Sequence, residues 1–251
     1  MPISRKHVIR HKPGAVLAAL AVLFTLLAPP ISAADPCEPI PGETFGETWI
    51  NPPPTDRPAA VHPDLNLIVR GYTPVNAPKE LTFYYGDADP RAPQLRGLFG
   101  DDRTPTITAV YRVFDWLWGE YRRGNTISKP EVSLIGVAVT PGEIIYLPPA
   151  GYTIGEGWDA LVLYADPLRI TIKYTREDSV VNGYTLHLEN LCPDPRLLAI
   201  YENCNNNNRG HLPALKDSQA IGRARGNELG IAIRDNGDFM DPRSSKDWWV
   251  K

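Results

Sequence analysis

"SLIGVAVTPGEIIYLPPAGY", residues 133–152, is the stretch that decides the fold. Two apolar runs rich in valine and isoleucine are separated by Pro141-Gly142 and followed by a Pro-Pro-Ala-Gly turn at 148–151. Short β-branched runs bounded by proline and glycine are typical of strands joined by tight turns. We therefore expect a β-hairpin here.

Similar runs occupy most of the chain on both sides of this hairpin. Alternation with a period of two marks strands in "DALVLYAD" (159–166), "RITIKYT" (169–175), "GYTLHLENL" (183–191) and "ELGIAIRDNG" (228–237), with a further strand in "QAIGRARG" (219–226). Upstream, strands are predicted within 65–75, 80–86, 108–124 and 131–139. One short helix is expected at 194–203, because Asp194 can cap it and Pro195 suits the first helical position. The sequence therefore predicts a mainly β protein with antiparallel sheets.

The N-terminal region predicts export. Four basic residues precede an uncharged apolar run at 15–28, and a small-residue segment ends near Ala34. This pattern is typical of a cleaved signal peptide over 1–34, with an uncleaved anchor as the alternative. The remaining chain carries 22 basic and 29 acidic residues, a net charge of −7. That charge favours neither nucleic acid nor an anionic membrane surface, and we expect no membrane span after cleavage.

Three cysteines in an oxidising compartment predict one disulfide and one remaining thiol. Cys192 and Cys204 flank a short loop, and closing it would stabilise the fold by roughly 3 kcal/mol. We expect this pair, with Cys37 then remaining a thiol or bonding to a partner chain; a bond from Cys37 to either of the others is the alternative. No cysteine spacing matches a zinc site.

Composition divides the exported chain into three parts. Residues 35–64 are rich in proline and without apolar periodicity, which indicates a semi-rigid linker. Residues 65–130 form a first β region, and residues 131–251 form the main β domain.

The main domain resembles the lysostaphin-type zinc endopeptidases, which cut peptide crosslinks in bacterial cell walls. That family begins with His-x-Gly-x-Asp, a strand, a turn, a second strand and an Ala-x-Gly turn, and residues 134–152 have that layout around Gly136. "GYTLHLENL" resembles the family's Gly-Tyr-x-x-x-Tyr-x-His-Leu strand. "SQAIGRA" and "ELGIAIRDNGDFMDP" resemble its two later segments. The resemblance implies a β-sandwich or barrel of the lysostaphin-type kind.

The resemblance also identifies the positions where chemistry would occur. Leu134 and Ala138 stand where the family has its first two zinc ligands, and Gly230 stands at the third. His187 is near the position of a histidine that assists catalysis. A catalytic zinc needs three nitrogen or carboxylate donors about 2 Å from the metal, and it lowers the pKa of bound water from 15.7 to about 7. Leucine, alanine and glycine donate nothing, so we expect no metal, no cofactor and no hydrolysis by the family's mechanism.

We therefore expect a secreted, non-catalytic module that binds cell-wall material such as peptidoglycan, or an envelope protein. The candidate contacts are Tyr184, His187, Glu228 and Arg234, although a lone histidine on a strand is more often a structural residue, which is the alternative for His187. One alternative is a hydrolase with an unrecognised site, using acids such as Asp159, Glu177 or Glu189. The other is a structural domain whose groove is filled by side chains such as Leu134. Two local features have ordinary explanations: a solvated hairpin turn for "YTREDSVVNGYT" and attachment of the C-terminus for Trp248 and Trp249.

Overall fold

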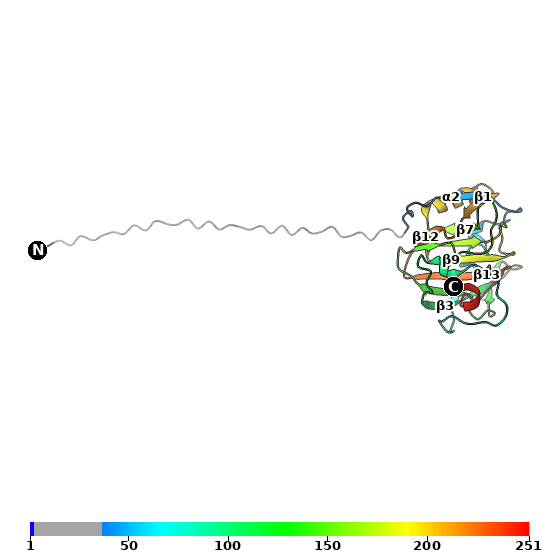
Figure 1. Ribbon diagram of the computed structural model, residues 1–251, viewed down its shortest axis with the longest axis horizontal. Coiled ribbons are helices and arrows are strands. Elements are labelled where there is room, and N and C mark those ends of the chain that lie inside the picture. The colour runs from blue at the N-terminus through cyan, green and yellow to red at the C-terminus, as the bar shows by residue number, and fades with distance from the viewer. Residues whose placement is uncertain (3–36, 251) are drawn as a thin grey trace. The chain divides into compact units, whose positions relative to one another are not determined.

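The computed structural model describes residues 1–2 and 37–250, and residues 37–250 form one compact unit (Figure 1). Apart from its first two residues, the predicted signal peptide falls outside the described residues. The fold is mainly β, as predicted. The strands are β1 (Gly46–Trp49), β2 (Tyr72–Pro74), β3 (Ile107–Leu117), β4 (Arg122–Thr126), β5 (Leu134–Ala138), β6 (Ile144–Tyr146), β7 (Ala160–Asp166), β8 (Arg169–Lys173), β9 (Tyr184–Glu189), β10 (Leu191–Pro193), β11 (His211–Leu215), β12 (Ala220–Ala224), β13 (Glu228–Asp235) and β14 (Asp238–Phe239).

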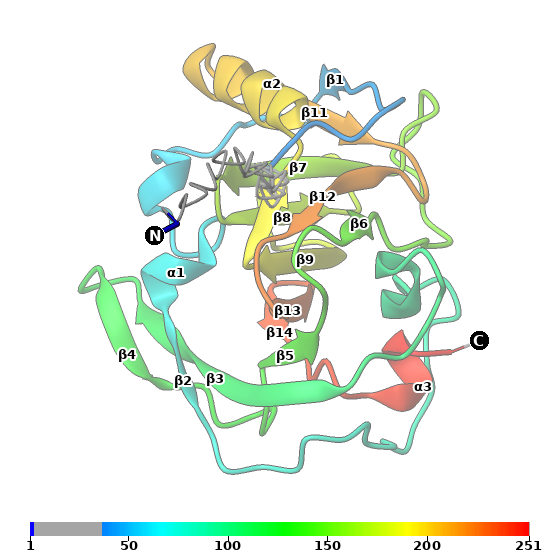
Figure 2. The same ribbon diagram turned by 90° about the vertical axis from the view of Figure 1, so that its left-hand side faces the viewer.

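Helices are few and short. They are α1 (Leu67–Arg70), α2 (Pro195–Asn206), α3 (Ser245–Trp248) and two 3₁₀ turns, Ala59–Val61 and Leu95–Leu98. The predicted helix is α2: Asp194 accepts a hydrogen bond from the Arg196 backbone N–H, and proline occupies the first turn. Leu197, Tyr201 and Cys204 make its buried face, which packs on β11 and β7 (Figure 2).

Among the described residues, the strands form one large antiparallel sheet and one small sheet. The large sheet runs β1-β11-β7-β8-β9-β13-β5-β3-β2, with β14 paired to β13 and β4 to β3. The small sheet runs β10-β12-β6. The hairpin predicted from residues 133–152 is thus split, because β5 joins the large sheet and β6 the small one. β5 pairs with β3 and β13, and β6 pairs with β12, rather than with each other.

Both faces of the central strands are buried. On β9, Leu186 and Leu188 face the main apolar core, while Thr185, His187 and Glu189 alternate onto the opposite face and are also covered. The second face is covered by residues around α1 and by Phe239. A sheet covered on both sides offers no open groove along its centre.

The predicted linker over 35–64 is wrong for its described part. β1 pairs with β11, and Ile40, Ile50 and Ala59 are buried. Asp194 holds this segment by accepting a 2.7 Å hydrogen bond from the Ile40 N–H. The sheet also continues across the predicted boundary at 130, because β3 pairs with β5. The described part of this proline-rich segment has irregular backbone that packs against the domain, and it is not a separate linker.

The predicted disulfide is also wrong. Cys192 bonds to Cys37, 155 residues away, and Cys204 is a buried thiol on α2 whose Sγ lies 3.0 Å from a carboxylate oxygen of Glu47. The fold of the N-terminal segment brings Cys37 next to Cys192. The spacing of the three cysteines in the sequence does not show this. The disulfide indicates an oxidising, extracytoplasmic compartment. Within the described part of the chain, no helix has the length and apolar character needed to cross a bilayer.

Three smaller predictions also differ from the structure. Residues 80–86 form no strand, and the apolar run at 67–70 is the helical turn α1. The turn at 174–185 is solvated only at its tip, since Val181 is exposed, whereas Asp178 is buried and ion-paired with Arg209 at 2.7 Å. The two C-terminal tryptophans do attach the chain end: both are buried, and their indole N–H groups donate to the carbonyls of Asp241 and Pro242.

Candidate functional site

The positions expected for zinc ligands lie on neighbouring strands. Gly136 on β5 pairs directly with Gly230 on β13, and Ala138 pairs with Glu228. Directly opposed residues of an antiparallel pair point to the same side of a sheet, as do residues two apart on one strand. Leu134, Gly136, Ala138, Glu228 and Gly230 therefore share one face, which we call the β5–β13 face.

Side chains fill this face. A Cβ built on Gly136 would fall 2.3 Å from Cδ of Glu228, so the glutamate lies directly over that glycine. Thr108 Oγ1 donates to Glu228 at 2.5 Å, and the Tyr111 hydroxyl donates at 3.1 Å. Leu134 is buried in an apolar cluster that includes Phe239. The carboxylate is thus used inside the protein.

A zinc ion does not fit the residues present on the β5–β13 face. Leucine, alanine and glycine at the three expected ligand positions carry no donor atoms, and Glu228 supplies a single carboxylate. Across the described residues, no group of three or more His, Cys, Asp or Glu side chains is arranged to hold a metal ion. The β5–β13 face therefore offers no chemistry that depends on a bound metal.

His187 is a buried structural residue rather than a ligand contact. Thr171 Oγ1 donates to the Leu65 carbonyl at 2.7 Å and lies 3.0 Å from His187 Nδ1. Because the threonine proton is used, Nδ1–H donates to Thr171, which leaves Nε2 as the bare nitrogen. Nε2 has no hydrogen-bond partner within the described structure. Burial and the nearby Arg234 charge lower the pKa of His187 to about 3, so the ring is neutral at physiological pH.

Arg234 belongs to a charge network beside this histidine. Its guanidinium contacts Asp64 at 2.9 Å, and Arg70 contacts the same carboxylate at 2.6 Å. Burial opposes ionisation of Asp64, but the two arginines lower its pKa to about 2. Arg234 also donates to the Gly237 carbonyl. These bonds hold the start of the β13–β14 turn in place, and they occupy the guanidinium of Arg234.

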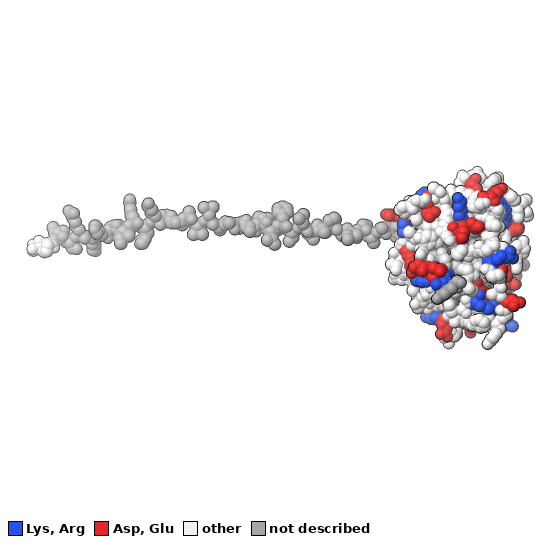
Figure 3. Space-filling model, viewed as in Figure 1, with Lys and Arg blue, Asp and Glu red and all other residues white. Residues whose placement is uncertain are grey.

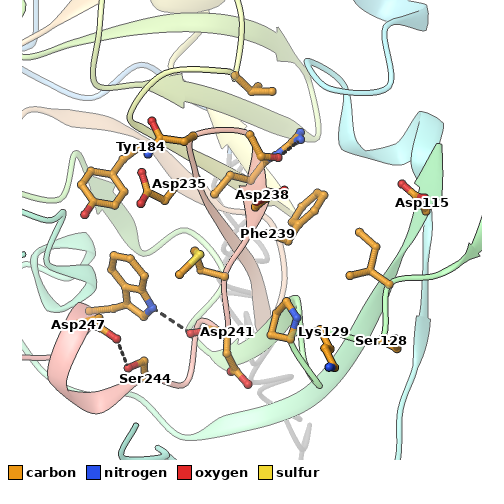
Figure 4. Close-up of a pocket in the computed structure, with 18 of the residues that line it drawn as sticks. Asp115, Ser128, Lys129, Tyr184, Asp235, Asp238, Phe239, Asp241, Ser244 and Asp247 are labelled. Carbon is orange, nitrogen blue, oxygen red and sulfur yellow. Dashed lines mark hydrogen bonds between the residues drawn. The ribbon is translucent and has the colours of Figure 1, made fainter. Parts of the chain in front are cut away.

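A cavity of about 1360 Å³ opens next to this network (Figure 4). We call it the aspartate cavity. Its walls come mainly from the loop at 84–89, the β3–β4 hairpin with residues 125–130, the turn from β13 to β14, and α3. Asp64, Arg70 and the segment 180–184 complete them. Figure 4 shows Tyr184 and Asp235 side by side near α3, with Asp115, Ser128 and Lys129 on the opposite wall. The volume exceeds that of most small-molecule pockets, which suits an extended ligand.

Hydrogen bonds hold the inner wall of the cavity in place. The Tyr184 hydroxyl donates to Asp89 at 3.1 Å, and the Tyr152 hydroxyl donates to the same oxygen at 2.5 Å. The Tyr184 ring meets the Trp248 ring edge to face at 5.8 Å. Burial raises the pKa of Tyr184, and the charges of Asp235 and Asp89 raise it further. Tyr184 is thus a fixed neutral donor with its ring against the cavity.

The outer rim carries exposed aromatic side chains. Tyr85 is 95 % exposed on the 84–89 loop, and Trp118 is 43 % exposed at the end of β3. Exposed aromatic rings beside carboxylates are common in binding sites, because a flat ring offers a large contact area. Charges of both signs are interspersed over the face shown in Figure 3, with no continuous basic patch there.

The structure therefore separates the four predicted contacts. Tyr184 and Arg234 line the aspartate cavity, His187 is buried behind Phe239, and Glu228 lies on the β5–β13 face. The prediction that His187 is a contact is wrong, because its side chain has no solvent-exposed surface. Glu228 is held away from the cavity by its own hydrogen bonds.

The acids of the alternative hydrolase do not meet. Glu189 is buried and ion-paired with Arg169 at 3.1 Å, and Glu177 accepts from the Asn51 side chain. Asp159 accepts from the Asp217 backbone N–H. None of the three lines the aspartate cavity.

Sequence reasoning missed most of the cavity wall. Asp89 lies in a region predicted as a turn, and Asp235 ends a strand where the family resemblance drew attention to neighbouring residues instead. The available signal was the concentration of aspartate and aromatic residues in 83–89 and 235–249. Comparisons of the chain with protein-family models, with curated proteins and with solved structures give no match.

Proposed function

We propose that this chain is a secreted, non-catalytic module with a lysostaphin-type β domain, and that it binds cell-wall material through the aspartate cavity. The observation that supports this proposal is the cavity. It has a volume of about 1360 Å³ and is lined by aromatic and carboxylate side chains from segments far apart in sequence. A pre-formed concave site with convergent polar groups is the default ligand site of a domain. Export follows from the N-terminal pattern of the sequence and agrees with the oxidised Cys37–Cys192 pair.

The family part of the proposal rests on strand register. Gly136 opposite Gly230 brings Leu134, Ala138 and Gly230 onto one sheet face, as the motifs of the resembled family require. Glu228 fills the space above Gly136. A face that is filled in this way supports neither hydrolysis nor binding. This favours the cavity at the end of β13 as the functional site.

Binding to insoluble cell-wall material tests the proposal. Purified exported protein is mixed with washed peptidoglycan, and the bound fraction is measured after centrifugation. We expect wild-type protein to sediment, and we expect Tyr85→Ala and Trp118→Ala each to reduce the bound fraction several-fold. Trp49→Ala is the matched control, because Trp49 is an aromatic residue on β1 that is 44 % exposed but does not line the cavity.

Each other outcome overturns part of the proposal. If wild-type protein stays in the supernatant, cell-wall binding is wrong. If Tyr85→Ala and Trp118→Ala both sediment like wild type, the cavity is not the site. Capture of one envelope protein that competes with peptidoglycan and depends on Tyr85 would replace cell-wall material by a protein partner.

A further inference from the structure

The aspartate cavity carries an excess of negative charge. Eight aspartates and four basic side chains line it. The basic groups are largely used within the protein: Arg70 and Arg234 bind Asp64, and Lys246 binds Asp247 at 2.7 Å. Within the described residues, Lys129 is the cavity's one basic group outside an ion pair. A ligand of opposite charge would complement this lining.

Several carboxylates of the cavity lack a direct ion pair. Among the described residues, Asp87, Asp235 and Asp238 have no ion-pair partner within 4 Å, although all three line the cavity. Asp89 accepts from two tyrosine hydroxyls and has only the Arg91 guanidinium at 3.8 Å. Lys173 acts on Asp235 from outside the cavity lining, so the cavity itself keeps an excess of negative groups.

The pKa of Asp235 reflects the repulsion between neighbouring carboxylates. Burial raises the pKa of Asp235, and the neighbouring Asp89 charge raises it further. A cation placed between the two carboxylates would relieve that repulsion and stabilise both ionised forms. Tyr184 also lines the cavity, and aromatic rings attract cations, most strongly where water is excluded.

We propose that the cavity binds a cationic peptide segment and seats a lysine or arginine side chain between Asp89 and Asp235, against the ring of Tyr184. This rests on the proposed function, since it uses the same cavity and specifies the ligand. A peptide fits better than a bare metal ion because the cavity is large and partly aromatic. The aromatic rim at Tyr85 and Trp118 contacts the parts of the peptide that flank the cation.

Fluorescence anisotropy with a labelled hexapeptide, Gly-Ala-Lys-Ala-Gly-Tyr, tests the inference. The comparison peptides are the same sequence with Nε-acetyl-lysine and with glutamate. We expect the lysine peptide to bind at least about tenfold more tightly than the acetylated one, because a charge-assisted hydrogen bond is lost. Binding should weaken as salt is raised.

Asp235→Asn should reduce affinity for the lysine peptide about tenfold and leave the acetylated peptide unchanged. Glu202→Gln on α2 is the matched control, because it removes a carboxylate from an exposed position that does not line the cavity. Thermal unfolding confirms that both variants are folded before binding is compared.

The outcomes separate this inference from the proposed function. Equal binding of lysine and acetyl-lysine peptides, or equal affinity of Asp235→Asn and Glu202→Gln, overturns the cationic ligand. Cell-wall sedimentation that depends on Tyr85, without binding of the lysine peptide, leaves the function standing and removes the inference. Tighter binding of a neutral glycan fragment than of the lysine peptide also removes it. Failure of both assays removes both proposals.

Discussion

The carboxylate of Glu228 lies directly over Gly136, so that a Cβ on the glycine would fall 2.3 Å from Cδ of the glutamate. Gly136 has no positive φ, so its backbone would accept a side chain. The glycine is required here by space rather than by conformation. Glu228 occupies that space because Thr108 and Tyr111 hold its two oxygens.

Gly136→Ala should therefore destabilise the protein by about 1–3 kcal/mol, the usual cost of inserting a methyl group into a packed site. The methyl group displaces Glu228 from its hydrogen-bond donors. The measurement is the free energy of unfolding from urea titration, followed by tryptophan fluorescence.

A double-mutant cycle separates this contact from a general effect of alanine in a strand. Gly136→Ala in a Glu228→Ala background should cost clearly less, because the displaced side chain is absent. Equal costs in the two backgrounds would show that Glu228 does not restrict Gly136.

His187 should make the protein sensitive to acid before most carboxylates titrate. Its pKa is about 3 in the folded state and 6.5 in the unfolded chain, so between these values the unfolded state alone binds the proton. Stability is complete above pH 6.5 and falls as pH decreases toward 3, by up to about 5 kcal/mol. His187→Phe, which keeps an aromatic ring beside Phe239, should lack this slope.

The measurement is the difference in unfolding free energy between wild type and His187→Phe from pH 7 to 4. Taking the difference removes the contribution of carboxylates common to both proteins. If the difference in unfolding free energy does not change with pH, His187 takes up its proton equally in the folded and unfolded protein, and the folded structure does not lower its pKa.

The fold class followed from the sequence because most strands carry their own pattern. Residues 169–173 alternate apolar and polar side chains, and 195–206 has both a capping aspartate and a proline in its first turn. Which strands pair with one another was harder to predict from the sequence. β5 and β6 are adjacent in sequence, yet they join different sheets, because register depends on which apolar faces meet.

The candidate site was predicted only in part. Tyr184 was singled out through a motif and does line the cavity, while Asp89 and Asp235 were missed. Local sequence does not show that a loop at 84–89 folds against the end of β13. For His187 the alternative of a structural role agrees with the structure and the contact role does not, because both faces of β9 are covered.

Lys173 should affect stability at alkaline pH. It is buried on β8, and burial lowers its pKa from 10.5 to about 8. Between these values the unfolded state keeps a proton that the folded state has lost, so stability rises with pH from 8 to 10.5. The rise relative to Lys173→Met should reach about 3 kcal/mol. Lys129→Met, at an exposed position, is the control and should follow wild type across this range.

The disulfide prediction concerns how the N-terminal segment is held. A non-reducing peptide map should show the Cys37 peptide joined to the Cys192 peptide, with Cys204 modified by iodoacetamide only after denaturation. Cys37→Ser should cost about 5 kcal/mol in unfolding free energy, because the bond closes a loop of sequence separation 155. Cys204→Ala keeps the bond and should cost only about 1 kcal/mol for the lost packing and thiol contact. A Cys192–Cys204 peptide in the native map would contradict the structure, in which Cys192 is bonded to Cys37 and Cys204 is a buried thiol.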